Sequence, residues 1–192
     1  MEQYAVRERG IALAEGHIVT NAAPAASHRT LSGEYAMPSR QNDHAQPADA
    51  IALLKADHQR VKDLFAQYEA ADNVETKRTL AEQVFTELDM HAQLEETVFY
   101  PTVNEETEEG PELVQESLSE HEAVNNLIQA LQSMAQDTDE FDAKFQELIR
   151  TVAHHVEEEE AAMFPLAEEE LADDLTEMKD EMQELKADLQ GS

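Results

Sequence analysis

Residues 91–101 read His91-Ala92-Gln93-Leu94-Glu95-Glu96-Thr97-Val98-Phe99-Tyr100-Pro101, and their pattern returns 64 positions later. The second copy is His155-x-x-x-Glu159-Glu160-x-x-Met163-Phe164-Pro165. In each copy an imidazole and a carboxylate stand four residues apart, one turn of an α-helix. A repeat of potential metal ligands is hard to obtain from packing requirements alone. This repeat therefore dominates the prediction of the fold.

A further acid–histidine pair precedes each copy. Asp57-His58 stands before the first copy and Glu120-His121 before the second, at an offset of 63 positions. Each half of the pattern thus has two imidazoles and one carboxylate on helical spacing. Two such halves predict an all-α, up-down four-helix bundle that closes on a pair of metal ions.

Apolar residues three or four positions apart predict four helices in this part of the chain. The helices are expected at about 49–71 and 75–103, from about 111 onward, and from about 139 onward. Asp49 is the expected N-cap of the first helix, and Pro111 suits a first helical turn. In each helix the histidine lies within the apolar stripe, as His58 does between Leu54 and Val61. The candidate ligands should therefore point into the core.

The segments on either side of the predicted bundle, residues 49–168, differ from it. Residues 1–48 are rich in Ala, Ser, Asn, Gln and Pro, which predicts a disordered, flexible leader in which His17, His28 and His44 are exposed. Residues 169–192 are acidic, and apolar residues there follow a heptad-like spacing: Leu171, Leu175, Met178, Met182, Leu185 and Leu189. We expect an amphipathic C-terminal helix packed on the bundle of a monomer. A weak homodimer through this helix is the alternative.

Composition excludes several classes of function. The formal net charge is −30, and no Lys or Arg occurs between Thr79 and Ala143, so attraction to nucleic acid or to an anionic membrane is not expected. The chain has no Cys, which excludes disulfides, iron–sulfur clusters and zinc–thiolate sites. No apolar run reaches the roughly 18 residues of a membrane span. The N-terminus mixes acids and bases without an apolar signal core, which favours a cytoplasmic protein.

Six side chains form the candidate metal site: His58, His91, Glu95, His121, His155 and Glu159. Burying the two glutamates without partners would cost several kcal/mol, on the order of the penalty for any uncompensated buried charge. Bound cations would remove that penalty, although a buried His–Glu hydrogen-bond network without metal is the alternative. Six ligands exceed the four of a structural zinc site, and two ions bridged by both carboxylates would use them all. Nitrogen and oxygen donors suit iron and, less specifically, zinc, manganese or copper.

Helical phase selects among adjacent candidates. His155 continues the stripe of Leu148 and Val152, whereas His154 is rotated by about 100° towards solvent. The same reasoning favours Glu159 over Glu158, and Glu95 over Glu96. The remaining acids near His155, which are Glu157, Glu158 and Glu160, are expected to form a solvated or supporting face.

Taken together, these motifs resemble the hemerythrin-like HHE cation-binding family. The resemblance covers about residues 49–168 and rests on Asp57-His58, Glu120-His121 and the two His-x-x-x-Glu-Glu segments. It implies a non-haem di-iron centre in which the four histidines ligate iron and the two glutamates bridge the ions, together with an oxo or hydroxo group. It also implies that O₂, NO or peroxide is the small ligand.

One position departs from the oxygen-carrying members of that family, which have a further histidine one turn after the histidine of the third helix. Asn125 stands at that position. This departure favours sensing, peroxide or NO chemistry, or iron handling over reversible O₂ carriage. Three hypotheses follow: a di-iron protein that binds or senses small oxidants, a di-iron oxidoreductase with catalase- or peroxidase-like activity, and an iron-handling stress protein. Whether the centre only binds its ligand or turns it over stays open.

Overall fold

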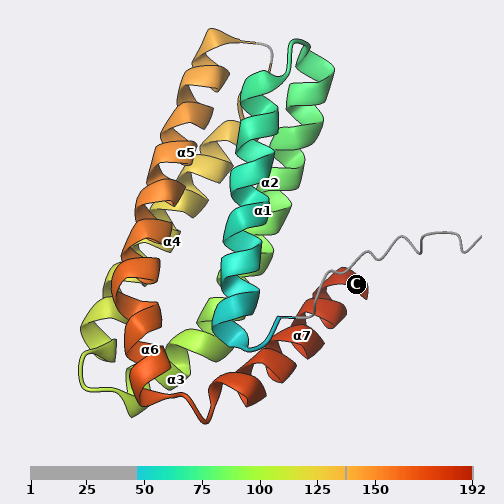
Figure 1. Cartoon of the computed structure of the whole chain (residues 1–192). Coiled ribbons are helices and arrows are strands. Elements are labelled where there is room, and N and C mark those ends of the chain that lie inside the picture. The colour runs from blue at the N-terminus through green and yellow to red at the C-terminus, as the bar shows by residue number, and fades with distance from the viewer. Residues whose placement is uncertain (1–46, 137, 192) are drawn as a thin grey trace, which may run out of the picture. The chain divides into compact units, whose positions relative to one another are not determined.

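The computed structural model describes residues 47–136 and 138–191, and helices form the regular structure of these residues (Figure 1). In chain order they are α1 (Ala50–Ala70), α2 (Val74–Leu94), the π-helical turn η1 (Glu95–Phe99), α3 (Tyr100–Glu106), α4 (Gly110–Gln132), α5 (Asp139–Glu158), the π-helical turn η2 (Glu159–Met163), α6 (Phe164–Glu170) and α7 (Leu175–Gly191). No strand occurs among the described residues, so the prediction of an all-α fold is confirmed. The predicted leader lies outside them apart from its last two residues, and so do His17, His28 and His44.

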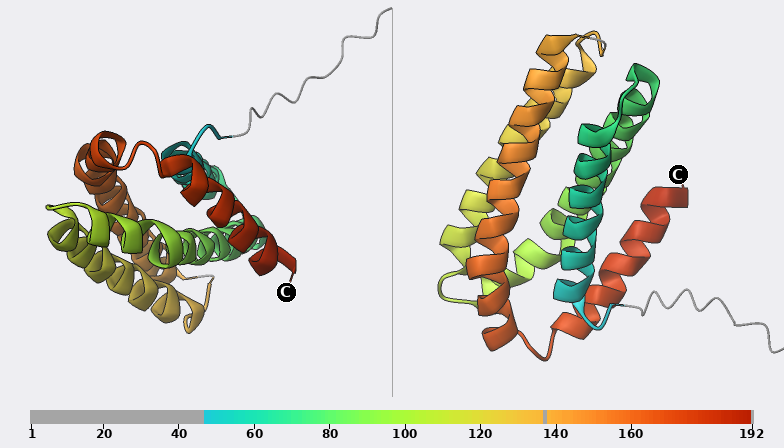
Figure 2. Two further views of the ribbon diagram at one scale, coloured as in Figure 1. Left: turned by 90° about the horizontal axis from the view of Figure 1, so that it is seen from below. Right: turned by 45° about the horizontal axis from the view of Figure 1, so that its top comes forward.

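Four long helical rods lie side by side and run alternately up and down (Figures 1 and 2). Two of them are α1 and α4. The other two are continuous through a π-helical turn: α2 with η1 and α3, and α5 with η2 and α6. Within the bundle α1 packs against α2, and α4 packs against α5. The predicted up-down four-helix bundle is thus confirmed.

Capping residues fix where the rods begin. The side chain of Asp49 accepts a hydrogen bond of 2.8 Å from the backbone N–H of Ala52, as expected from its position before the first apolar stripe. Asn73 and Thr138 cap α2 and α5 in the same way. Pro111 lies in the first turn of α4, where its missing N–H costs nothing.

The sequence had led us to expect regular α-helices throughout. The second and fourth rods depart from this expectation. The backbone N–H of Tyr100 donates to the carbonyl of Glu95, and that of Phe164 donates to the carbonyl of Glu159, so each rod contains one widened turn. Pro101 and Pro165 follow directly and have no N–H to complete the regular α-helical pattern. Both widened turns begin at a candidate metal ligand. Such π-bulges are frequent at functional sites.

Two apolar clusters fill the bundle. One includes Ile51, Leu54, Leu94, Phe99, Val114, Met163 and Met182, and the other includes Val61, Phe65, Leu88, Val124, Leu131, Phe145, Leu148 and Val152. Each candidate histidine lies along the chain between members of the two clusters, as His58 does between Leu54 and Val61. The apolar core is therefore interrupted by one polar layer.

The C-terminal helix α7 packs against α1 and α2 (Figure 2, right). Met178 and Met182 are buried, and Leu185 is partly buried against the same cluster. On the same helix, Lys186 donates to both carboxylate oxygens of Asp57 at 2.7 Å. Within residues 47–136 and 138–191, no helix combines the length and hydropathy needed to cross a bilayer.

Candidate metal centre

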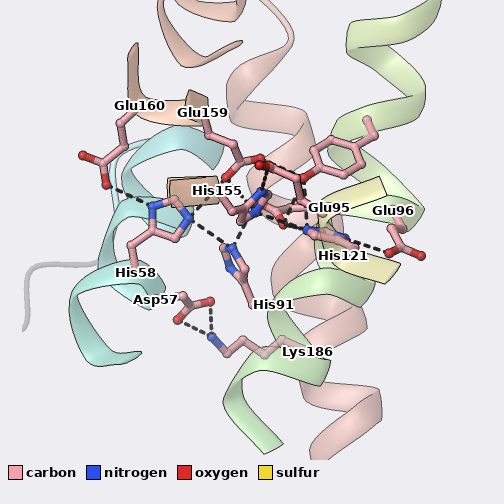
Figure 3. Close-up of polar contacts among 12 residues, drawn as sticks. Asp57, His58, His91, Glu95, Glu96, His121, His155, Glu159, Glu160 and Lys186 are labelled. Carbon is pink, nitrogen blue, oxygen red and sulfur yellow. Dashed lines mark hydrogen bonds and ion pairs between the residues drawn. The ribbon is translucent and has the colours of Figure 1, made fainter. Parts of the chain in front are cut away.

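The polar layer contains the six side chains singled out in the sequence, and each of them is buried (Figure 3). Their exposed fractions are 3% for His58, 5% for His91, 0% for Glu95, 9% for His121, 3% for His155 and 1% for Glu159. They come from all four rods, because the histidines lie on α1, α2, α4 and α5 and each glutamate opens a π-helical turn. The fold thus brings the six residues together.

The first half of the layer is built on His58 and His91. Their Nε2 atoms lie 3.1 Å apart. Glu159 Oε2 lies 3.3 Å from the Nε2 atom of His58, and Glu95 Oε1 lies 3.1 Å from that of His91. Two nitrogens and two carboxylate oxygens therefore converge within the reach of one cation.

The second half is similar, but the group within reach of one cation here consists of His121, His155 and Glu95. Here the two Nε2 atoms lie 3.2 Å apart. Glu95 Oε2 approaches His121 to 3.2 Å, and Glu159 Oε2 approaches His155 to 3.5 Å. Each carboxylate thus faces a histidine of both halves, which is the placement that a bridging ligand requires.

The donor set fits two cations. Two nitrogens that bind one transition-metal ion at about 2.1 Å lie about 3.0 to 3.4 Å apart, and both histidine pairs have such a separation. In addition, Glu95 Oε1 and Glu159 Oε2 are buried and make no hydrogen bond of good geometry among the described residues, although the Nε2 atoms of His91 and His58 lie close to them. Buried carboxylate oxygens need a partner, and a cation between the halves would provide it.

The charges in the layer favour ionised Glu95. Burial would raise the pKa of Glu95, but the neighbouring charge of His91 and the hydrogen bond from His121 hold it well below the ordinary value. Burial would likewise lower the pKa of His121, yet its hydrogen bond to Glu95 raises it to about 9. At His155, burial lowers the pKa despite the carboxylates nearby. The attraction between Glu95 and the neighbouring histidines therefore stabilises the ionised form of this buried carboxylate.

The outward-facing ring nitrogens of three histidines contact carboxylates. Glu160 lies 3.0 Å from His58 Nδ1, Glu96 lies 2.8 Å from His121 Nδ1, and Glu120 lies 3.0 Å from His155 Nδ1. An acceptor at Nδ1 fixes the tautomer that leaves Nε2 free for a metal ion and raises the basicity of the ring. A supporting role for Glu160 was one of the two alternatives expected from the sequence, whereas the roles of Glu96 and Glu120 were missed. The Glu-Glu pair in each repeat and Glu120 before His121 are the sequence features that could have indicated these contacts.

Tyr100 is a further polar member of the layer that sequence reasoning did not single out. Its hydroxyl donates to Glu159 Oε1 at 2.8 Å and lies 3.2 Å from His121 Nε2. Burial, followed by the charges of Glu95 and Glu159, raises the pKa of Tyr100. The equivalent residue of the second repeat, Phe164, stacks on His58 with ring centroids 5.7 Å apart. The difference between Tyr100 and Phe164, which are equivalent in the two repeats, could have singled out Tyr100 in the sequence.

His154, which helical phase rejected as a ligand, lies outside the layer. The side chain of His154 is 64% exposed and lies 3.4 Å from Glu158. Asn125, at the position of the extra histidine of oxygen carriers, is exposed and accepts a hydrogen bond from Gln129. Asn125 does not reach the six candidate ligands.

A cavity of about 1110 Å³ extends between α2 and α4 to the polar layer. All four histidines line it, as do the apolar side chains of Leu88, Val124 and Val152. Exposed Asn125 and Gln129 also line it. The space is far larger than a diatomic molecule requires, and it gives the candidate ligands a route to solvent.

Comparison with known proteins relates this site to other chains. A DNA nickase of a Nostoc species is 25% identical over 147 residues, 77% of this chain and 41% of that protein. An uncharacterized hemerythrin-like protein of Schizosaccharomyces pombe is 28% identical over 124 residues, 64% of this chain and 61% of that protein. The chain therefore spans less than two thirds of either curated relative.

A solved structure and a family model agree with the fold described above. The crystal structure of a hemerythrin HHE cation binding domain-containing protein from Mycobacterium kansasii superposes with a TM-score of 0.65 at 24% identity, covering 74% of this chain and 88% of that one. Residues 49–167 match the model of the hemerythrin HHE cation binding domain, a range that includes all six candidate ligands. The chain belongs to the hemerythrin HHE cation-binding domain family.

Proposed function

We propose that the protein binds two non-haem iron ions in the polar layer and captures a small oxidant there: O₂, NO or peroxide. The observation that carries the proposal is the pair of buried carboxylates, Glu95 and Glu159, each placed between a histidine of one half and a histidine of the other. His58 and His91 would hold one ion, and His121 and His155 the other. Both glutamates would be shared.

The residues around the layer prepare it for this role. Bound iron would supply binding of the oxidant and electron transfer to it. Glu160 and Glu96 hold the rings of His58 and His121 with Nε2 facing inward. The apolar clusters on both sides limit solvent, while the cavity between α2 and α4 admits a small molecule. The position of Asn125 leaves the cavity side of the layer without a further imidazole.

Anaerobic reconstitution with Fe(II) tests the proposal. We expect two iron ions per chain by elemental analysis, and a change in the ultraviolet–visible spectrum on adding O₂, NO or H₂O₂. Glu95→Ala should reduce the iron content and abolish the spectral change. Glu158→Ala, an equivalent truncation on the exposed side, should retain both. Uptake of zinc but not iron, or two bound irons without any spectral response, would contradict the proposal.

A di-iron oxidoreductase with catalase- or peroxidase-like activity is the second candidate, because Tyr100 provides a protonated hydroxyl next to Glu159 and His121. Reduction of peroxide requires proton delivery, and a buried phenol beside the ligands is placed to supply it. Sustained turnover of H₂O₂ by the iron-loaded protein would favour the enzyme. A stoichiometric spectral change without turnover would favour the binding protein.

Other roles have less support. The net charge of −30 repels phosphate backbones, so we propose no nucleic-acid activity, although the Nostoc relative carries the name of a nickase. Iron handling by the acidic surface would require far more than two ions per chain. Location in the cytoplasm and a monomeric state stay predictions from the sequence.

A further inference from the structure

The two halves of the polar layer differ in how their histidines are supported. In the second half, Glu120 lies 3.0 Å from His155 Nδ1. The repeat places Asp57 in the equivalent position beside His91, because Asp57 precedes His58 as Glu120 precedes His121. His91 Nδ1, however, is buried without a hydrogen-bond partner among the described residues. It is the only Nδ1 atom of the four layer histidines for which this holds.

The carboxylate of Asp57 is engaged elsewhere. Lys186 of α7 donates to both of its oxygens at 2.7 Å, and the two side chains are only 19% and 7% exposed. Figure 3 shows Asp57 beside His91 with its dashed contacts directed at Lys186. Arg60 is the other cation near Asp57, but its Nε lies 3.9 Å away and its side chain is 56% exposed. The strong contact is therefore the one from α7.

We propose that Lys186 is a positioning residue that keeps the carboxylate of Asp57 from hydrogen-bonding to His91 Nδ1 and so makes the two halves of the metal centre unequal. This inference rests on the proposed metal centre. A carboxylate at the outer nitrogen of a ligand histidine orients the ring, and its removal typically costs about 10- to 100-fold in metal affinity. The half with His121 and His155 has this support at both rings. The half with His58 and His91 has it at His58 alone.

The consequence is that α7 controls the weaker of two metal positions. While α7 is docked, the ion held by His58 and His91 binds less tightly than the ion held by His121 and His155. Any event that lifts α7 from α1 and α2 releases Asp57 to His91 and tightens the weaker position. Helix α7 thus adjusts the metal affinity of the centre without contributing a ligand.

Zinc titration of the full chain, with its variants, tests this role without depending on iron chemistry. Lys186→Met should tighten the weaker zinc ion by about 10- to 100-fold and leave the tighter ion unchanged. Adding Asp57→Ala to this variant should remove the gain. The matched control is Lys179→Met, because Lys179 lies on the same helix with 17% exposure and pairs only with adjacent Asp180 among the contacts of the described residues. It should behave like the unchanged protein.

An unchanged or weakened second zinc ion in Lys186→Met, with helical content retained, would overturn the proposal. Nuclear magnetic resonance of the zinc-loaded, unsubstituted protein provides a test that does not depend on a variant folding. The Nδ1 protons of His58, His121 and His155 should be hydrogen-bonded and slow to exchange, whereas that of His91 should exchange faster. Four equivalent signals would also overturn it. Failure to bind zinc and Fe(II) alike would instead refute the metal centre itself.

Discussion

At the scale of single residues, two neighbouring positions on a helix differ by a rotation of about 100°, which is enough to separate a candidate ligand from a surface residue. His155 is 3% exposed and faces His121, whereas the side chain of its neighbour His154 is 64% exposed. Both are histidines on the same helix, and both have a glutamate four positions later. The difference comes only from the direction in which the apolar stripe of α5 points.

This pair supports a first prediction. His155→Ala should remove at least one iron ion per chain, because it deletes one of the two nitrogens that the second half offers. His154→Ala removes an identical side chain from the exposed side and should leave the iron content near normal. Elemental analysis of both variants after Fe(II) reconstitution is the measurement. If His154→Ala emptied the site while His155→Ala did not, the assignment of ligands on α5 would be wrong.

Tyr100 supports a second prediction at this scale. Tyr100→Phe gives the first repeat the residue type that the second repeat already has at Phe164. The iron content should stay at two per chain, because the hydroxyl is not one of the six proposed ligands. Any turnover of H₂O₂ should fall by about 10²- to 10⁴-fold, the usual range for loss of a general acid. Unchanged turnover would show that Tyr100 serves packing alone. Phe99→Leu, a buried change on the same turn, controls for disturbed packing.

At the scale of elements, the sequence predicted the helices well and their irregularities poorly. Asp49 and Pro111 marked helix starts because capping and first-turn preferences are local. The π-helical turns were missed, since one extra residue in a turn barely disturbs a spacing of three and four. Pro101 and Pro165 could have indicated these turns, because a proline inside a helix has no N–H for the regular α-helical pattern. The contact between Asp57 and Lys186 was out of reach, because it joins residues 129 positions apart and depends on how α7 docks.

A third prediction concerns a contact that joins helices α1 and α2 to helix α5. The hydroxyl of Tyr68 on α1 donates to Asp142 on α5 at 2.6 Å, and Lys77 on α2 donates to the same carboxylate at 2.9 Å. Burial raises the pKa of Asp142, but the hydrogen bonds from Tyr68 and Lys77 and the charge of Lys77 together outweigh it and lower the pKa below 3.8. A carboxylate with a lowered folded-state pKa stabilises the fold above its unfolded pKa, and this stabilisation is lost as the pH falls through the folded value.

Asp142→Asn should therefore reduce the free energy of unfolding by about 1 kcal/mol at pH 7, a value that allows for the partial exposure of the pair. The difference from the unchanged protein should shrink as the pH falls below about 3.8 and the native carboxylate takes up a proton. Urea unfolding at a series of pH values measures it. Glu157→Gln, a change at an exposed position of the same helix, should show no such trend. A difference that grew towards low pH would have the wrong sign.

At the scale of the whole molecule, the fold accepts a polar layer between two apolar clusters. Such a layer destabilises a bundle unless its charges are compensated, because Glu95 and Glu159 are buried and each has an oxygen without a hydrogen-bond partner among the described residues. Metal binding and folding should therefore be coupled here. The net charge of −30 adds to this coupling, since bound cations reduce the repulsion within the chain.

The last prediction follows from this coupling. A ligand present at about 100 times its dissociation constant stabilises the folded state by about 2.7 kcal/mol, so two ions at that saturation contribute about 5 kcal/mol. In a domain of this size about 1 kcal/mol shifts the melting temperature by roughly 2–4 °C. Removing the metal with a chelator should thus lower the melting temperature by about 10 °C or more, and Fe(II) should restore it. Differential scanning calorimetry, with metal content checked in each sample, is the measurement. His154→Ala should show the same drop. A melting curve that stayed in place after complete metal loss would mean that the buried carboxylates find their compensation in protonation or in the imidazoles, which is the hydrogen-bond network without metal.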